Sequence, residues 1–299
     1  MVIPIIRLAV VLFSLCIALA TLAVLMGAAI PGDEIAFVSG RTGSFEIYVM
    51  DVSRGQVENL THLQAFTQNP AWSPDGTLLA FESAQGGEFG IWVINASGRD
   101  MRRLIPGRAG EPAWSPDGAY IVFSSDRDGY FDIYIASLDG SQIRRLTSDK
   151  ATDFNPAWSP DGARIIFQST RGPDYSFSIY SMNTNGEEMQ LLSDKHSIAI
   201  DPAWSPDGTR IAFLSTQWGG KSLHVMDADG GNVQPLLAST SSYDGSPSWS
   251  PDGTRIAFDS DRFGNGYAYS WGIYVMNADG SDVRLLTEGV RPAWRPRVG

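Results

Sequence analysis

The chain has 299 residues, of which 43% are hydrophobic and 18% charged, a balance typical of a globular protein with a sizeable core. It carries 33 acidic residues against 22 lysines and arginines, and the resulting net charge of −11 repels phosphate backbones and argues against a nucleic-acid partner. The single cysteine, Cys16, excludes an intramolecular disulfide and a cysteine-based zinc cluster.

The N-terminal segment 1–32 predicts export. Residues 8–30 contain no charged residue, follow Arg7 and are closed by acidic residues. As a helix, this run is about 34 Å long, enough to cross a hydrocarbon core of about 30 Å. The order of charges places the N-terminus in the cytoplasm and the rest outside. The small residues at 27–29 also suit a signal peptidase, so both a signal anchor and a cleaved signal peptide stay open.

A seven-residue sequence, PAWSPDG, recurs through segment 33–299. Its tryptophan returns every 42 to 46 residues. A period in this range indicates a repeated supersecondary unit. The copies lie at residues 70–76, 112–118, 156–162 and 202–208, with PSWSPDG at 247–253 and a truncated PAWRP at 292–296.

Each repeat offers four short extended segments joined by turns. Ile121 and Phe123 alternate with Val122, the period of a strand, and no repeat carries a sustained helical stripe. The SPDG sequence suits a tight reversal because proline fixes φ, aspartate bonds the nearby backbone and glycine accepts a positive φ. Four-stranded units at this period predict an all-β propeller. The repeats lie near 33–66, 70–108, 112–148, 156–193, 202–238 and 247–287.

The truncated copy predicts how the ring closes. The first repeat lacks a PAW segment, whereas the chain ends with one at 292–296. If this C-terminal strand completes the first repeat, the protein is a six-bladed β-propeller with no unpaired edge at the seam. One hydrophobic helix, anchor or signal, would precede it.

The repeated text PAWSPDG, IAF and IYVMN-DGS resembles the PD40, or WD40-like, repeat of the TolB family of bacterial envelope propellers. The likeness covers 33–296, while the family's separate N-terminal α/β domain has no counterpart before the first repeat. The resemblance implies an exported, non-catalytic propeller that binds a protein or peptide in the cell envelope. We expect a monomer that contacts the membrane through its N-terminal helix if that helix is not cleaved.

Candidate binding residues lie where the repeats differ. The residue before each PAW proline varies, and if the PAW strand is innermost, these six residues ring one mouth of the central channel. They could hold a cation, a peptide segment or water, or form a solvated rim in which a neighbouring acid neutralises Arg291. The six are Asn69, Glu111, Asn155, Asp201, Ser246 and Arg291.

A second candidate surface is aromatic. The longest loop, 260–272, carries four aromatic residues, and the fifth repeat adds one more. Exposed aromatics are typical binding anchors, although a long loop can also bury its own. The residues are Trp218, Phe263, Tyr267, Tyr269 and Trp271.

Enzyme chemistry is not favoured. The repeated tryptophans and SPDG aspartates are what every blade needs to fold, and the three histidines are scattered without metal-ligand spacing. We therefore expect no catalytic residue, metal or cofactor, although DxDG turns leave calcium open. The alternative functions are a small-ligand or glycan sensor at the channel mouth and, less favoured, a propeller hydrolase.

Overall fold

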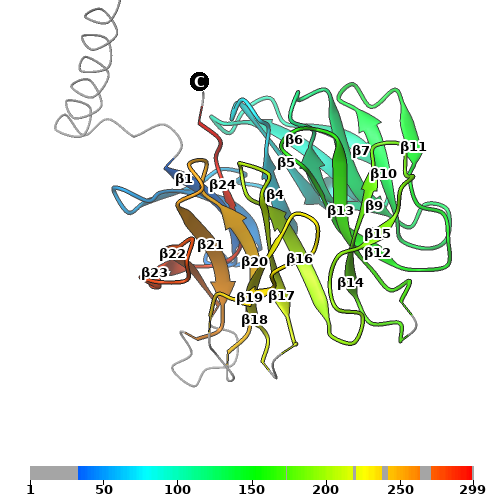
Figure 1. The fold of residues 1–299 in the computed structure, drawn as a ribbon. Coiled ribbons are helices and arrows are strands. Elements are labelled where there is room, and N and C mark those ends of the chain that lie inside the picture. The colour runs from blue at the N-terminus through cyan, green and yellow to red at the C-terminus, as the bar shows by residue number, and fades with distance from the viewer. Residues whose placement is uncertain (1–32, 173, 218–219, 238–241, 263–270, 298–299) are drawn as a thin grey trace, which may run out of the picture.

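The computed structural model describes residues 33–172, 174–217, 220–237, 242–262 and 271–297. These residues form 24 strands in six antiparallel four-stranded sheets, arranged as blades around a common centre (Figure 1). Among them no helix combines the length and apolar character needed to span a lipid bilayer. The predicted leader 1–32 lies outside the described residues.

Each blade has its innermost strand at the channel and its fourth strand at the outer surface. From the channel outward, blade 1 contains β24 (Val290–Trp294), β1 (Glu34–Ser39), β2 (Glu46–Asp51) and β3 (Gln56–Asn59); blade 2 contains β4 (Thr67–Trp72), β5 (Leu78–Ser83), β6 (Gly90–Asn95) and β7 (Arg102–Pro106). In the same order, blade 3 contains β8 (Ala109–Trp114), β9 (Tyr120–Ser125), β10 (Asp132–Ser137) and β11 (Ile143–Arg145); blade 4 contains β12 (Asp153–Trp158), β13 (Arg164–Ser169), β14 (Ser178–Asn183) and β15 (Gln190–Leu191). Blade 5 contains β16 (Ala199–Trp204), β17 (Arg210–Ser215), β18 (Ser222–Asp227) and β19 (Gln234–Pro235); blade 6 contains β20 (Asp244–Trp249), β21 (Arg255–Ser260), β22 (Gly272–Asn277) and β23 (Arg284–Glu288). A 3-10 turn, η1 (Gln85–Gly87), lies between β5 and β6.

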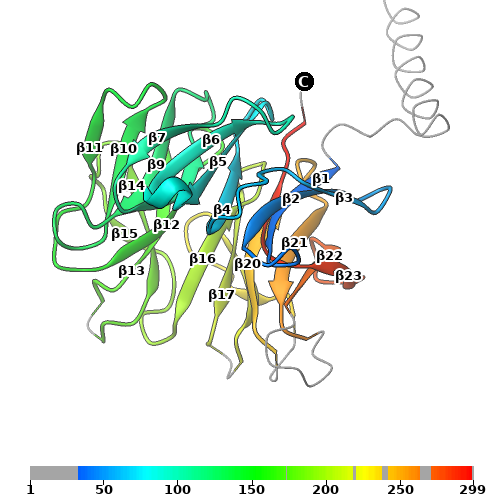
Figure 2. The same cartoon turned by 180° about the vertical axis from the view of Figure 1, so that it is seen from behind.

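The C-terminal strand closes the ring, as the truncated repeat predicts. Strand β24 pairs antiparallel with β1, bringing Trp294 opposite Ile35. Both views show the red C-terminal strand beside the blue first strand (Figures 1 and 2). Arg295 continues the closure, since its N–H donates to the carbonyl of Glu34 at 2.8 Å.

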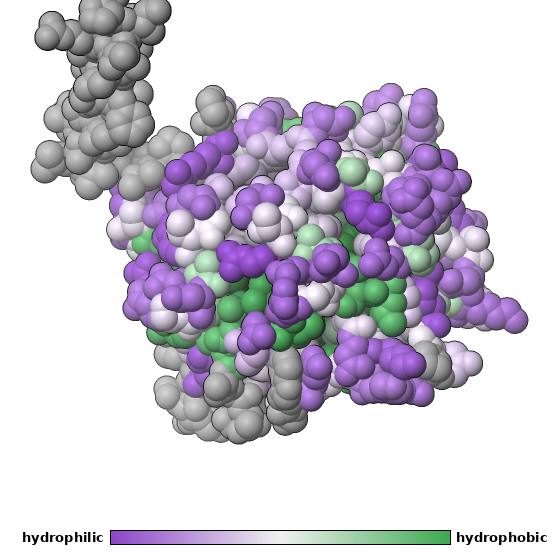
Figure 3. Space-filling view, viewed as in Figure 1, coloured by the Kyte–Doolittle hydropathy of each residue, from purple (hydrophilic) through white to green (hydrophobic). Residues whose placement is uncertain are grey.

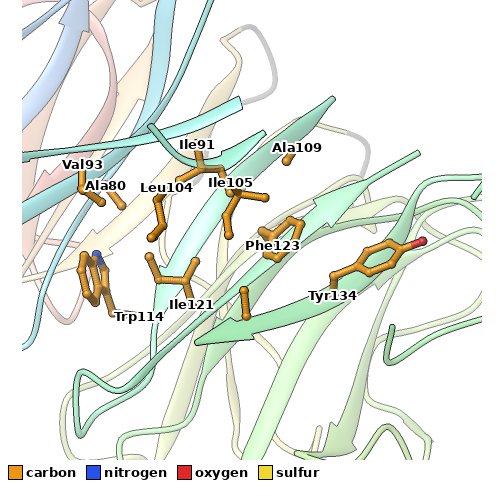
Figure 4. Packing of buried hydrophobic residues seen from close by; sticks show 11 residues of the cluster. Ala80, Ile91, Val93, Leu104, Ile105, Ala109, Trp114, Ile121, Phe123 and Tyr134 are labelled. Carbon is orange, nitrogen blue, oxygen red and sulfur yellow. The ribbon is translucent and has the colours of Figure 1, made fainter. Parts of the chain in front are cut away.

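The core lies between neighbouring blades. In the cluster drawn in Figure 4, Ile91 and Val93 of blade 2 pack against Trp114, Ile121 and Phe123 of blade 3. All five are at least nine-tenths buried. Each blade therefore stabilises the next, and hydrophilic side chains cover most of the surface seen in Figure 3.

The SPDG segments form the predicted turns. The hydroxyl of Ser73 and the backbone N–H of Thr77 both donate to Asp75 Oδ1, at 2.5 and 3.0 Å, and these bonds hold the pKa of Asp75 below its usual range. Gly76 adopts the left-handed region with φ 65°, a conformation that glycine reaches without strain. Equivalent serine and backbone bonds recur at Asp117, Asp161, Asp207 and Asp252. These repeated aspartates therefore shape the turns.

Aromatic packing explains His224. In four blades an arginine lies over a stacked or tilted Phe–Tyr pair, as Arg127 lies over Phe123 and Tyr134 in blade 3 at 5.2 and 5.1 Å. In blade 5 the tyrosine position holds His224, 1% exposed and 5.9 Å from the ring of Phe213. Burial lowers the pKa of His224, so it is a neutral packing residue, as its position in the repeat predicts.

Candidate functional site

The six residues before the PAW prolines surround one opening of the channel, in a cavity of about 150 Å³. In every blade the pairing between the inner and second strands shifts register at this residue and its proline, which makes a β-bulge. All six backbones are left-handed, with φ between 48° and 56°. Such a conformation is strained in residues other than glycine and persists only where the surroundings impose it. The bulge aims all six side chains at the opening: Asn69, Glu111, Asn155, Asp201, Ser246 and Arg291.

Hydrogen bonds between blades fix this ring. Glu111 Oε2 accepts the backbone N–H of Asn155 in the next blade and the hydroxyl of Ser124, both at 2.8 Å. The N–H of Arg291 donates to Asp259 Oδ2 of the preceding blade at 2.8 Å. In the same way the N–H of Asp201 bonds Gln168 Oε1 at 2.9 Å, and the N–H of Ser246 bonds Asp201 Oδ2 at 3.4 Å. The mouth is therefore held in place before any ligand arrives.

The mouth holds more acidic than basic groups. Among the described residues around it, four carboxylates (Glu82, Glu111, Asp201 and Asp259) face the guanidinium of Arg291, whose Nη1 lies 3.4 Å from Asp201 Oδ1. The carboxylate of Asp201 raises the pKa of Arg291, so the guanidinium stays charged. Burial raises the pKa of Glu111 to about 7, and it also raises the pKa of Glu82 and of Asp259. The acidic groups therefore outnumber the one cation, and those that are ionised attract a further cationic group.

An aromatic rim surrounds this mouth on the same face. The residue just before the third strand of a blade is aromatic in every blade except blade 5, where it is Lys221. The carbonyl of Phe45 accepts the N–H of Thr67, where the inner strand of blade 2 begins, at 3.0 Å, so these residues lie at the entrance side of the channel. Phe45 is 53% and Phe89 51% exposed. With their ring contacts, the rim comprises Phe45, Phe66, Phe89, Phe131, Phe154, Phe177, Tyr243 and Trp271.

Two hollows interrupt the rim. One, of about 370 Å³, lies where blades 6, 1 and 2 meet and is lined by Phe45, Phe66 and Trp271, next to Arg291. The rings of Phe45 and Phe66 meet edge to face at 6.3 Å. The other, of about 490 Å³, lies between blades 2, 3 and 4 and reaches from the aromatic rim to Glu82 and Glu111. Both hollows thus join aromatic surface to the charged mouth.

Of the predicted loop aromatics, Trp271 is described. It lines the first hollow, half-buried, and meets the ring of Tyr243 edge to face at 5.3 Å. The other four lie outside the described residues: Trp218, Phe263, Tyr267 and Tyr269.

Sequence reasoning missed most of the aromatic rim and four polar groups beneath the mouth. The sequence contains a pattern that could have predicted both the rim and these polar groups. A phenylalanine recurs in FEI, FGI, FDI and FSI at residues 45, 89, 131 and 177, and the middle residue of each F-x-S motif in the second strand varies from blade to blade. That variable position holds the polar groups that bond the ring: Glu82, Ser124, Gln168 and Asp259.

The described residues contain no group of three or more histidine, cysteine, aspartate or glutamate side chains able to hold a metal ion. The histidines lie far apart in the fold. His196 pairs with Asp174 at 3.4 Å on the surface between blades 4 and 5, and His224 is buried in blade 5.

Comparison with known proteins identifies the family. The family description "TolB beta propeller domain" (PD40) matches residues 29–107, 104–197 and 177–298, which together span the propeller. The chain belongs to this TolB β-propeller family. The resemblance seen in its repeats is thereby confirmed.

The TolB relatives share the propeller over different lengths. The crystal structure of TolB from Acinetobacter baumannii is 27% identical with a TM-score of 0.77, over 93% of this chain and 70% of that one. Putative TolB from Agrobacterium tumefaciens is 24% identical with a TM-score of 0.70, over 86% of this chain and 90% of that one, which shows the fold alone. A TolB homologue of Chlorobium luteolum is 40% identical over 68 residues, or 23% of this chain and 16% of the relative. The matched segments thus span well under a third of the curated relatives.

Propellers at lower identity include a peptidase and an oligogalacturonate lyase, and at that level the likeness shows only the fold.

Proposed function

We propose that this TolB-family propeller is an extracytoplasmic, non-catalytic binding protein that recognises an extended segment of a protein partner in the cell envelope. The segment lies on the aromatic rim and inserts one cationic side chain into the channel mouth. The protein acts as a monomer, and its leader either tethers it to the membrane or is removed on export.

One observation carries the proposal: exposed aromatic side chains surround a rigid, acid-rich mouth to which the blades contribute five different residue types. Phe45, Phe66 and Phe89 keep between 43% and 53% of their surface exposed, which costs free energy in water unless a partner covers them. Aromatic anchors around a central polar contact are typical of protein interfaces.

The size of the mouth favours a side chain over a glycan or drug-sized ligand. Its cavity of about 150 Å³ is smaller than the roughly 300 to 1,000 Å³ of sites that enclose small molecules. A lysine or arginine side chain is narrow enough to enter and would meet Asp201 and Glu111. The glycan-sensor alternative therefore has less support than peptide recognition.

Capture experiments test the proposal. The full chain is immobilised in detergent and used to recover partners from envelope extract, which are identified by mass spectrometry. Changing Phe45 and Phe66 to serine should reduce recovery of the specific partner by at least about tenfold, because each aromatic anchor contributes on the order of 1 to 2 kcal/mol. A matched control, Ile143→Ser, removes an apolar side chain that is 38% exposed on the outer strand β11 and should leave recovery unchanged.

Equal losses in the double variant and in Ile143→Ser would contradict recognition by the rim. Mass spectrometry of the mature N-terminus decides separately between anchor and cleaved signal.

A further inference from the structure

A groove opens between blades 3 and 4 on the face opposite the aromatic rim, where the SPDG turns lie. Its cavity measures about 520 Å³. Tyr120 and Trp158 contribute aromatic surface, Asp117 and Asp161 stand at the SPDG turns, and Arg144 lies on the outer side. This groove plays no part in the function proposed above.

Other junctions between blades show what fits against the same tryptophan. The guanidinium of Arg210 lies 4.9 Å from the ring of Trp249, and that of Arg255 lies 4.7 Å from the ring of Trp294. Both arginines are the first residue of a second strand, β17 and β21, and each covers the tryptophan of the next blade. At the junction of blades 1 and 2, an arginine from the closing segment, Arg295, covers Trp72 at 4.8 Å.

Blade 3 has no arginine at this position, whereas the corresponding residue of blade 4, Arg164, is present but bonds Ser181 and the carbonyl of Glu188. The residue that corresponds to Arg210 and Arg255 in blade 3 is Tyr120, the first residue of β9, which is 40% exposed. At the preceding junction Leu78 fills the equivalent place and packs against the cluster that contains Trp114. Trp158, in contrast, is only half-buried and lines an open cavity.

We propose that this groove binds the guanidinium group of an arginine side chain from a partner protein, stacked on Trp158 as the chain's own arginines stack elsewhere. Planar guanidinium groups bind well to indole faces. Asp117 and Asp161 supply the counter-charge. Their Oδ1 atoms accept the turn hydrogen bonds, and within the described part of the chain no hydrogen bond uses Oδ2 of either.

Arg144 does not block the site. Its two terminal nitrogens donate to the carbonyls of Thr184 and Asn185, at 2.9 and 3.1 Å, which holds the guanidinium toward the hairpin turn of blade 4. Two carboxylates and this one cation line the groove, and the nearby guanidinium of Arg164, which acts on Asp161, is held by Ser181 and the carbonyl of Glu188. An arriving arginine therefore approaches from the side of Asp161 and Trp158.

Ligand titration of the full chain, labelled with ¹⁵N in its tryptophans, tests the proposal. The Trp158 indole signal is assigned with Trp158→Phe. N-acetyl-arginine amide should shift this signal saturably, and the uncharged isostere N-acetyl-citrulline amide should bind at least roughly fivefold more weakly because it lacks the cation. Equal affinity for the two amides would overturn the proposal.

Two further comparisons test whether the ligand is a protein side chain and whether it takes the place of the arginine that is missing in blade 3. The peptide acetyl-Ala-Arg-Ala amide should bind more tightly than free arginine if the natural ligand is a protein side chain, and the reverse order would contradict a protein partner. Tyr120→Arg should supply the missing internal arginine and abolish binding of N-acetyl-arginine amide, whereas Tyr120→Phe should keep it. Undiminished binding to a folded Tyr120→Arg protein would show that the guanidinium does not lie over Trp158.

Discussion

The two ends of the central channel are built on opposite principles. At the rim end, side chains of five types stand on six left-handed bulges, with asparagine occurring twice. At the turn end, the same tryptophan recurs in all six blades around a cavity of about 550 Å³. The backbone conformation repeats from blade to blade at both ends. The two ends therefore differ in their side chains.

At the turn end a tryptophan stands at every junction, but its contacts vary. The indole N–H of Trp114 donates to the carbonyl of Ala71 at 3.0 Å, and that of Trp249 to the carbonyl of Ala203 at 3.2 Å, each reaching the preceding blade. Among the described residues, the indole N–H groups of the other four have no such partner: Trp72, Trp158, Trp204 and Trp294. What all six share is the indole ring that lines this end of the channel. At the rim end the bulge itself sets the backbone, and the side chains are free to differ. Uniform positions mark structure, and divergent ones mark the candidate binding surface.

Removing the closing strand should have the largest effect on both ends. A chain that stops at Gly289 loses β24, and with it Trp294, the pairing to β1 and the ring residue Arg291. The exposed edges of β1 and of the open seam should then cause unfolding or aggregation. Size-exclusion chromatography and circular dichroism measure this. A chain that stops at Arg297 is the control and should behave as the full chain; a monomeric, cooperatively melting Gly289 variant would contradict the closure.

Changing a single tryptophan at the turn end should cost less, but still a large part of the stability. Trp294 is 5% exposed, and its ring is covered by Arg255. Trp294→Ala should lower the free energy of unfolding by about 3 to 5 kcal/mol, since it leaves a cavity in the seam. Trp204 is only half-buried, so Trp204→Ala should cost clearly less. Urea unfolding measures both, and equal losses would show that burial does not set the cost.

Changing Arg291 tests the charge of the rim end. Arg291→Met leaves Asp201, Asp259 and Glu111 without their cation, so we expect a loss of about 2 kcal/mol at pH 8. The loss should shrink at pH 5, because the unpaired carboxylates can then take up protons. The control is Arg297→Met, which breaks an exposed pair with Asp252 at 3.1 Å and should cost under about 1 kcal/mol. Urea unfolding at both pH values distinguishes the variants, and losses that match at pH 8 would contradict a role for charge in the mouth.

The sequence predicts the fold well because the repeat samples the same local chemistry six times. The turn residues and the alternation predict the blades, and the truncated PAW copy predicts the closing strand. The structure confirms both. The sequence also predicts that the six ring residues lie together, because their position before the proline is constant, and all six line one cavity.

Other features of the site depend on three-dimensional contacts that no local pattern states. Arg291 of blade 1 pairs with Asp201 of blade 5 at the channel mouth. These two residues lie 90 positions apart in sequence. The sequence also does not predict that Phe45 and Phe89 are exposed, because a phenylalanine beside a strand suggests a core residue until the strand's surroundings are known. The open surface beside Trp158, where blade 3 has no arginine, is recognised only when the junctions between blades are compared in the structure.

The smallest effect concerns one proton at the rim end. Burial raises the pKa of Glu111 from 4.5 to about 7, so the folded protein holds this proton more tightly than the unfolded chain does. Stability should therefore fall as pH rises from about 4.5 to 7, and stay lowered above that range. The full shift corresponds to about 3 kcal/mol, but solvent at the mouth screens it, and we expect on the order of 1 kcal/mol. Glu111→Gln should remove this slope, while Glu88→Gln, on an exposed residue paired with Arg103, should keep it. Thermal unfolding of the three proteins from pH 5 to 8 measures the difference. Parallel profiles for the native chain and Glu111→Gln would show that Arg291 already keeps Glu111 ionised. An ionised Glu111 would make the mouth more strongly attractive to a cation at neutral pH.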